Sequence, residues 1–304
     1  LSAAYGATRL STAGFIDAIR ILAAAPHAQA TMAPGRDLVR LGEKLAAAQN
    51  RGAVLRLMRE LYRPRLDALD SLGAAANESA AVKRALFRTK LVRLLALDAE
   101  DPSLRAALAQ RAARYIRLDG GDAAGLDESA LDPALISVAL AAGVRELGAP
   151  FAETLIERLL ASSDAKFRGE AAVALGATDD AALGDRVREL LTGGLLRARE
   201  PTSLAFALAK RPSQRRATFD WFRANEPEFT ESMSHFAQRW LPRMGAGFCT
   251  TAERDEVEEF FAPLVGKWQG AERTLAEVLE GIELCAALRE AKGPEVDEYF
   301  STSF

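Results

Sequence analysis

Hydrophobic and polar residues recur along this chain with the spacing of α-helices. Segments of about ten to twenty residues carry apolar side chains three or four positions apart, separated by short runs of Gly, Pro, Asp or Ser. No segment shows the alternation typical of a β-strand. The pattern predicts an all-α fold. The expected helices lie at residues 15–22, 38–45, 54–72, 82–97, 150–161, 165–175, 179–191, 201–209, 212–224, 250–261 and 270–288.

Capping residues mark three helix starts. Asp101 and Asp132 each precede a proline, which suits the first helical position because the N–H that it lacks has no partner there. Thr250 and Glu253 have the spacing of an N-cap and the third helical residue, so each side chain is expected to accept a hydrogen bond from the other's backbone N–H. These residues predict where helices begin.

The order of the helices predicts their arrangement. From about residue 130 onward, short helix pairs recur at a spacing of about thirty residues, as in HEAT or armadillo repeats. We therefore expect residues 1–304 to form a single right-handed α-solenoid of antiparallel helix pairs with a concave inner face. A Gly- and Asp-rich stretch at 118–127 indicates a subdivision near 118–130. Its acidic residues lack the EF-hand spacing, so it is interpreted as a solvated loop.

Composition excludes several functions. The chain has 304 residues, 49% of them hydrophobic and 27% charged, with a net charge of −3, which argues against binding to nucleic acid. No run of eighteen apolar residues indicates a membrane span, and no signal peptide is visible. A soluble protein, cytoplasmic or periplasmic, is expected. Because the chain begins at Leu1 rather than Met, we interpret it as a piece of a longer protein. Cys249 and Cys285 are too few and too far apart in sequence to indicate a disulfide framework.

Catalytic motifs are missing from the sequence. The two histidines, His27 and His235, are too far apart for H-E-x-x-H, which places two zinc ligands and a general base on one helix. His235 stands beside Ser234 and precedes Cys249, but no third residue that would orient such a base is apparent. We therefore expect no catalytic residue, metal site or cofactor in this chain.

Arginines supply the candidate binding residues. Arg197 and Arg199 precede Glu200, and Arg239 and Arg243 share one helical face. Taken singly, each is typical of a solvated helix surface. Together on a concave face, the candidate contacts for the end of a peptide are Arg197, Arg199, Glu200, Arg239 and Arg243. A peptide carboxylate suits the fork of guanidinium donors. A further basic cluster comprises Lys210, Arg211, Arg215 and Arg216.

Several segments carry a family resemblance. Residues 168–180 read as a helix that ends in Leu-Gly before an acidic break, and 218–225 as an aromatic helix that ends in Asn. Residues 250–261 form an acidic helix that ends in Phe-Phe, and Gly-Ala-Glu-Arg at 270–273 opens a long helix. In this order the segments are similar to the C-terminal domain of bacterial zinc aminopeptidases of the aminopeptidase N family and of endoplasmic-reticulum aminopeptidases.

The resemblance implies a non-catalytic domain that walls a substrate chamber, receives the distal part of a peptide and assists opening and closing. Its partners are then the N-terminal catalytic domain, which holds the zinc, and peptide substrates. The parent protein is expected to remove N-terminal amino acids from peptides. The principal alternative is a free-standing HEAT-like interaction scaffold, and a self-contained enzyme comes third.

Overall fold

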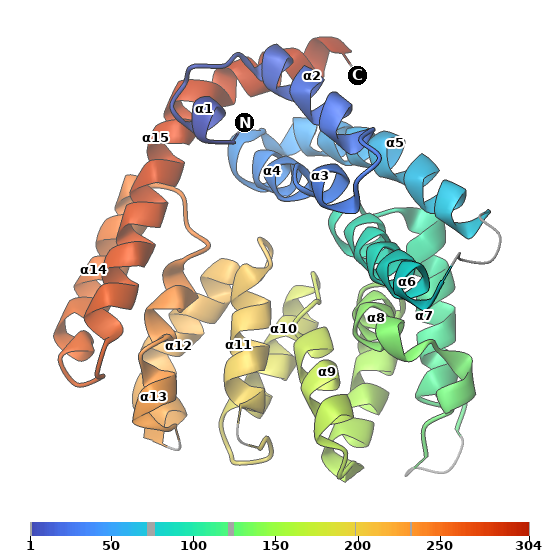
Figure 1. The fold of residues 1–304 in the computed structure, drawn as a ribbon. Coiled ribbons are helices and arrows are strands. Elements are labelled where there is room, and N and C mark those ends of the chain that lie inside the picture. The colour runs from blue at the N-terminus through green and yellow to red at the C-terminus, as the bar shows by residue number, and fades with distance from the viewer. Residues whose placement is uncertain (1, 72–76, 121–124, 198, 232, 304) are drawn as a thin grey trace. The chain divides into compact units, whose positions relative to one another are not determined.

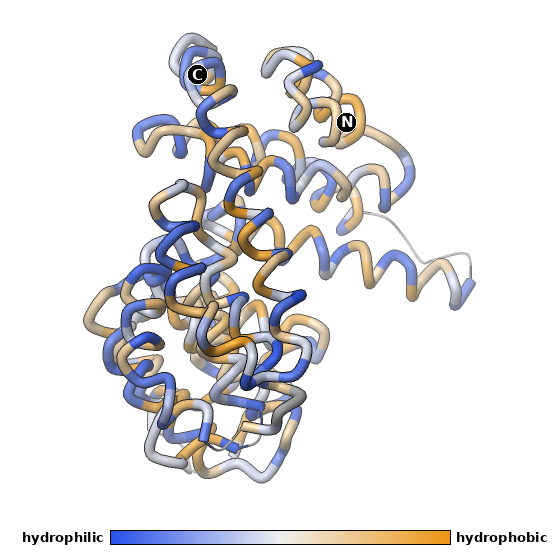
Figure 2. The backbone as a smooth tube through the Cα atoms, turned by 90° about the vertical axis from the view of Figure 1, so that its left-hand side faces the viewer, coloured by the Kyte–Doolittle hydropathy of each residue, from blue (hydrophilic) through white to orange (hydrophobic). Residues whose placement is uncertain are grey.

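The computed structural model describes residues 2–71, 77–120, 125–197, 199–231 and 233–303. Helices and turns make up these residues, with no β-strand among them, so the all-α prediction is confirmed. Figure 2 shows hydrophobic and hydrophilic stretches alternating along the helical tube. Two compact units are present: unit 1 comprises Leu1–Arg105 and Ala287–Phe304, and unit 2 comprises Ala106–Ala286. The stretch at 118–130 therefore lies inside unit 2.

Unit 1 surrounds a core of fully buried side chains such as Ile16, Leu57 and Tyr62. Two of its helices continue directly into π-helical turns, η1 and η3. Its elements, shown in Figure 1, are α1 (Ser2–Gly6), α2 (Thr12–Ala23), α3 (Ala28–Met32), α4 (Gly35–Arg40), η1 (Leu41–Leu45), η2 (Ala48–Asn50), α5 (Arg51–Asp70), α6 (Glu78–Arg93), η3 (Leu94–Asp98), the start of α7 (Pro102–Tyr115) and the end of α15 (Ala271–Ser303).

The end of α15 caps two other elements of unit 1. The Glu295 carboxylate accepts a hydrogen bond from the Thr12 backbone N–H at 2.6 Å, where α2 begins. Asp297 accepts from the Ala47 N–H at 2.8 Å, directly before η2, and from the Asn50 side chain at 2.8 Å. Carboxylates here satisfy backbone donors that have no partner within their own helices. The expected helix at 270–288 is thus longer than its apolar pattern indicated.

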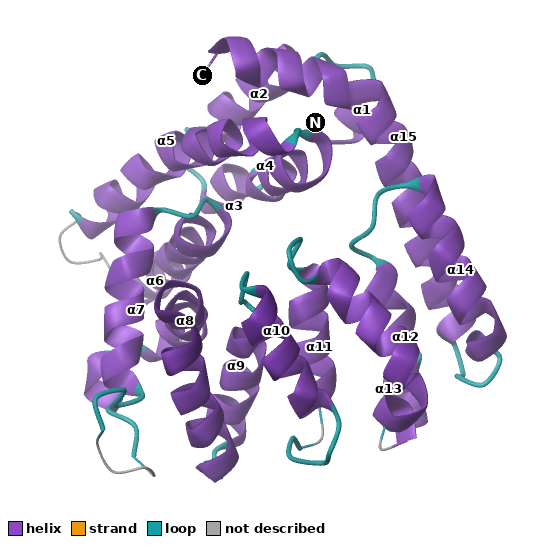
Figure 3. Cartoon of the chain, turned by 180° about the vertical axis from the view of Figure 1, so that it is seen from behind, coloured by secondary structure: helices purple, strands orange, loops and turns teal. Residues whose placement is uncertain are grey.

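Unit 2 stacks helices that are neighbours in sequence. Helix α9 packs against both α8 and α11, and α11 packs against α12, as Figures 1 and 3 show. At Gly176 a Cβ atom would lie 2.4 Å from that of Ala207, so α9 and α11 approach too closely for a larger residue. Such stacking is typical of helical solenoids, while the handedness and the concave face stay predictions.

The elements of unit 2 include three 3-10 segments, η4, η5 and η6, and a fourth, η7, between α13 and α14. They are the end of α7, η4 (Glu128–Ala130), η5 (Pro133–Leu135), α8 (Ile136–Ala161), α9 (Ala165–Leu175), α10 (Ala181–Arg188), η6 (Glu189–Leu191), α11 (Glu200–Lys210), α12 (Arg215–Glu231), α13 (His235–Gln238), η7 (Leu241–Gly245), α14 (Thr251–Val265) and the start of α15.

The predicted caps are present, one of them with a different partner. Asp101 accepts from the Leu104 N–H and Asp132 from the Ala134 N–H, each at 2.9 Å. Thr250 Oγ1 accepts from the Glu253 N–H at 3.2 Å. The Glu253 carboxylate, however, accepts from the Cys249 N–H at 3.0 Å and from the Thr250 hydroxyl, rather than from the Thr250 N–H. The cap therefore reaches one residue further back than predicted.

Helix α8 lies in a long apolar segment. Residues Pro133–Ala161 contain a window of mean hydropathy 1.4, so this one segment is long and apolar enough to cross a membrane, a feature that the sequence analysis did not identify. Gly148, at φ 62° and ψ −143°, breaks the segment into two helices. Moreover, 56% of the window is buried inside the protein, and Phe151 is fully buried. The kink and the burial both indicate that this segment is part of the protein core.

The expectation for the two cysteines is wrong. Cys249 and Cys285 form a disulfide with their Cα atoms 5.0 Å apart. Figure 1 shows α14 and α15 side by side, because the chain turns back between them. Cys249 directly precedes this hairpin and Cys285 lies in α15, so their separation of 36 residues in sequence does not measure their separation in space.

Candidate functional site

Arg197 and Arg199 lie in the loop before α11, with both side chains exposed. The same loop ends at Glu200, whose side chain is buried in unit 2. Arg168 Nε and Nη2 donate to the two carboxylate oxygens of Glu200 at 2.7 Å each, and the Arg197 N–H donates to Glu200 Oε2 at 2.8 Å. Both oxygens of Glu200 are therefore engaged, and the residue anchors the loop that presents Arg197.

Electrostatics support this anchoring role. Burial raises the pKa of Glu200, but hydrogen bonds from Arg168 and Arg197 and their positive charges outweigh it, so the pKa lies below its ordinary value. Arg168 is itself only 1% exposed and also donates to backbone carbonyls at the end of α8. The sequence around Arg168 does not indicate this role, because nothing local distinguishes a buried arginine from a solvated one.

Arg239 and Arg243 come together around an aromatic ring. Their guanidinium carbons lie 4.6 Å and 4.3 Å from the centre of the Trp240 ring. Arg243 is exposed, whereas Arg239 is half-buried. Cation–π contacts of this kind fix the position of a guanidinium. Figures 1 and 3 show α13, which directly precedes Arg239, at the same end of the stacked helices as the loop before α11.

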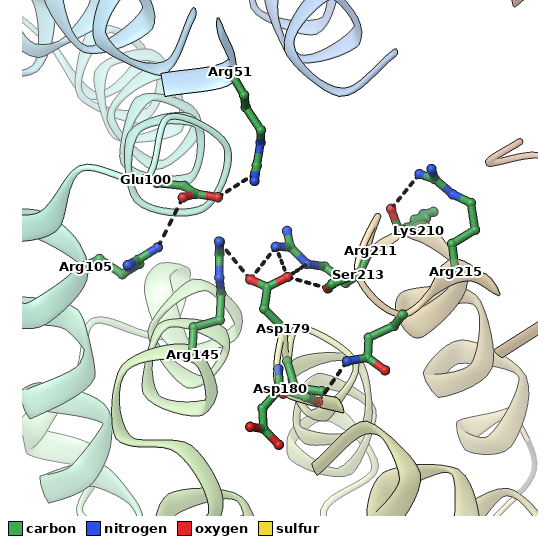
Figure 4. Close-up of polar contacts among 12 residues, drawn as sticks. Arg51, Glu100, Arg105, Arg145, Asp179, Asp180, Lys210, Arg211, Ser213 and Arg215 are labelled. Atoms are coloured by element: carbon green, nitrogen blue, oxygen red, sulfur yellow. Dashed lines mark hydrogen bonds and ion pairs between the residues drawn. The ribbon is translucent and has the colours of Figure 1, made fainter. Parts of the chain in front are cut away.

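Two members of the basic cluster at the turn between α11 and α12, Arg211 and Arg216, pair with acidic residues, while Arg215 donates to the Lys210 carbonyl. Arg211 donates to Asp179 Oδ2 at 2.6 Å, Ser213 donates to Asp179 Oδ1 at 2.7 Å, and Arg145 lies 3.3 Å from Asp179 Oδ2 (Figure 4). Burial raises the pKa of Asp179, but the contacts with Arg211, Ser213 and Arg145 outweigh this effect, so the pKa lies below its ordinary value. Arg216 instead pairs with Glu256 at 2.7 Å. These arginines therefore hold helices together.

Unit 1 carries a smaller ionic group, which Figure 4 also shows. Glu100 lies 2.8 Å from Arg51 and 3.9 Å from Arg105, joining the start of α5 to the start of α7. All three side chains are partly exposed, so the stabilisation that they supply is modest.

Comparison with known families decides the relationship of the chain. The ERAP1-like C-terminal domain matches residues 2–284. The chain belongs to this family. It is therefore a C-terminal domain of the kind found in aminopeptidases, and the resemblance seen in the sequence is confirmed at this level. No curated protein matches the chain.

Residues of this ERAP1-like domain do not fit the zinc of an aminopeptidase. His27 precedes α3 as its N-cap residue, and the side chain of His235 lies outside the described residues. Within the described part of the chain, no three His, Cys, Asp or Glu side chains gather to hold a metal ion. Asp127 caps η4 by accepting from Ser129, whereas Asp122 lies outside the description. No step of zinc chemistry is assigned to these residues.

Proposed function

We propose that this ERAP1-like domain is the non-catalytic part of a zinc aminopeptidase, where it walls the substrate chamber and receives the distal part of the peptide. Zinc and the peptidase chemistry belong to a separate catalytic domain, which is its intramolecular partner. The observation that carries the proposal is the family match across residues 2–284. Changes in the position of this domain then open and close the chamber.

Three exposed arginines suit the distal peptide carboxylate. Arg197 and Arg199 stand on a loop that the buried Glu200 fixes from below, and Arg243 lies against Trp240. A guanidinium fork donates two parallel hydrogen bonds to a carboxylate, and pre-positioning reduces the entropy lost on binding. Glu200 is assigned the positioning of Arg197 rather than contact with peptide. Arg239 is assigned the support of Trp240.

The test uses the full aminopeptidase with Arg197 and Arg199 both replaced by alanine. We expect kcat/KM for long peptides with a free C-terminal carboxylate to fall by about threefold to tenfold, or about 0.7–1.4 kcal/mol, as fits exposed charged contacts. Short peptides and long peptides with an amidated C-terminus lack the contact and should keep the wild-type rate. Measuring kcat/KM over a series of peptide lengths, with both end groups, checks this.

Arg273→Ala is the matched control, since that arginine is 88% exposed and pairs only along α15 with Glu277. This variant should leave the dependence of kcat/KM on peptide length unchanged. An unchanged profile in the double variant would remove Arg197 and Arg199 from the proposal. The alternative, a free-standing HEAT-like scaffold, is tested separately by reading the coding sequence upstream for H-E-x-x-H, whose absence would favour the scaffold.

A further inference from the structure

A cavity of about 200 Å³ lies in unit 2, where the end of α7, the η4–η5 segment and the start of α9 meet. Its lining combines aromatic and apolar walls with acidic groups, and we name it the Tyr115 pocket. Prominent in the lining are Tyr115, Glu128, Ile136, Asp164, Phe167 and Glu170. None of these residues is among the proposed peptide contacts, so the pocket is independent of that proposal.

Tyr115 is the first sign of a missing ligand. Only 4% of the residue is exposed, yet its hydroxyl has no hydrogen-bond partner among the residues that the structure describes. Burial and the nearby carboxylates raise its pKa to about 12, so the hydroxyl remains protonated and can donate or accept. The hydroxyl is therefore free to hydrogen-bond to a ligand in the cavity.

Charge in the pocket is the second sign. Glu170 is half-buried and makes no hydrogen bond or ion pair within the described chain, and burial is the largest cause of its raised pKa. Asp164 uses one oxygen to cap α9 through the Lys166 N–H at 2.9 Å. With Glu128, three carboxylates line the pocket and only the Lys166 ammonium opposes them. The pocket is therefore negatively charged.

We propose that the Tyr115 pocket binds a small organic cation, a primary ammonium or a guanidinium. Carboxylates supply ionic partners, the buried phenol accepts a hydrogen bond, and the rings of Tyr115 and Phe167, 6.2 Å apart and tilted by 55°, offer aromatic surface to the cation. A metal ion suits the pocket less well, because these carboxylates do not converge as metal ligands. The volume accommodates the end of a lysine or arginine side chain, and a free amine carries the same chemistry.

The experiment titrates the full chain with n-butylammonium, and separately with a short acetylated and amidated peptide that contains one lysine. Butanol and the same peptide with norleucine are the neutral controls. We expect both cations to bind, and the neutral molecules to bind at least tenfold more weakly. Binding of butylammonium alone would identify a free amine as the occupant, and binding of the peptide alone a basic side chain. Binding of neither cation would overturn the proposal.

Variants locate the binding in the pocket. Glu170→Gln keeps the shape and should weaken cation binding about tenfold, and Tyr115→Phe about threefold to tenfold, through loss of charge-assisted and neutral hydrogen bonds. Lys166→Gln should tighten binding, because it removes the competing ammonium. Glu157→Gln, which changes an exposed carboxylate on α8, is the matched control and should have no effect. Wild-type affinity in the Glu170 and Tyr115 variants would place the cation elsewhere and overturn the proposal.

Discussion

Individual buried arginines link the helices of unit 2. Arg158, 6% exposed, donates from α8 to the Ile116 carbonyl at 3.0 Å. Arg188, 4% exposed, donates from α10 to the Gln214 and Thr218 side chains at 3.0 Å and 3.3 Å. Arg168 links α9 to Glu200 at the start of α11. Burying a guanidinium is unfavourable unless its donors are satisfied, so each arginine also specifies which helices are neighbours.

The pair of Arg168 and Glu200 gives the sharpest test at this scale. Glu200→Gln leaves the buried Arg168 charge without its partner, and we expect unfolding free energy to fall by about 3–5 kcal/mol, as for other broken buried pairs. Chemical denaturation of the purified chain measures the change. Glu277→Gln breaks an exposed pair with Arg273 and should cost less than about 1 kcal/mol. Equal effects of the two variants would contradict the buried role of Glu200.

The difference in unfolding free energy between the wild type and Glu200→Gln should depend on pH, which provides a second test. The pKa of Glu200 is lower in the folded chain than its ordinary value of 4.5. Its ionised form therefore stabilises the fold fully above pH 4.5, and this contribution is lost as pH falls through the folded-state pKa. We expect the stability gap between wild type and Glu200→Gln to narrow below pH 4.5. A gap that is constant from neutral to acidic pH would show that the charge of Glu200 is not what stabilises the fold.

Elements with strong local signals could be predicted from sequence, and elements fixed by distant contacts could not. The helix at 165–175 has the predicted bounds, because Asp164 caps its start and Gly176 follows its end. The expected helix at 150–161 agrees with the part of α8 that follows the break at Gly148, whereas the extension of α15 to Ser303 was missed. In the second case the deciding contacts, of Glu295 and Asp297 with the starts of α2 and η2, come from the other end of the chain.

Candidate residues divide in the same way. The exposure of Arg197 and Arg199 follows from their position in a loop. Arg239 and Arg243 do not share one helical face as expected, because Arg239 follows the end of α13 and Arg243 lies in η7, and both contact the Trp240 ring between them. The burial of Glu200 does not follow from its position in the sequence, since it depends on Arg168, which stands 32 positions earlier in the chain. The Tyr115 pocket was missed for the same reason, as its walls come from α7, η4, η5, α8 and α9.

The hairpin of α14 and α15 provides the test at the scale of elements. The disulfide ties the residue before α14 to α15, and both cysteines are buried. Because it closes a loop of the unfolded chain, replacing both cysteines with serine should lower unfolding free energy by about 2–5 kcal/mol. Thermal unfolding, with and without reductant, measures this.

The control for the hairpin is reduction of the double-serine variant, which should leave its melting temperature unchanged. If the melting temperature of the wild type stays the same after the disulfide is shown to be reduced, the disulfide does not stabilise the fold. Recovery of the two cysteines as free thiols from freshly purified native protein would contradict the disulfide itself.

At the scale of the whole molecule, the question is whether this ERAP1-like domain, with its two compact units, has peptidase activity by itself. Its described residues contain no cluster of potential metal ligands, and its two histidines stand far apart in sequence. A zinc hydrolase needs three protein ligands around one metal and a base beside it, and the described residues bring no such set together.

We therefore expect the purified chain, supplied with zinc, to release no product from an aminoacyl chromogenic substrate, and to bind zinc no more tightly after dialysis than a chain in which His27 and His235 are both replaced by alanine. The full aminopeptidase under the same conditions is the positive control for substrate and metal. As a control for contamination, the chain is purified with two different affinity tags, because a contaminating peptidase would not follow the chain through both. Hydrolysis that copurifies with the chain in both preparations and disappears on chelation would overturn the non-catalytic assignment.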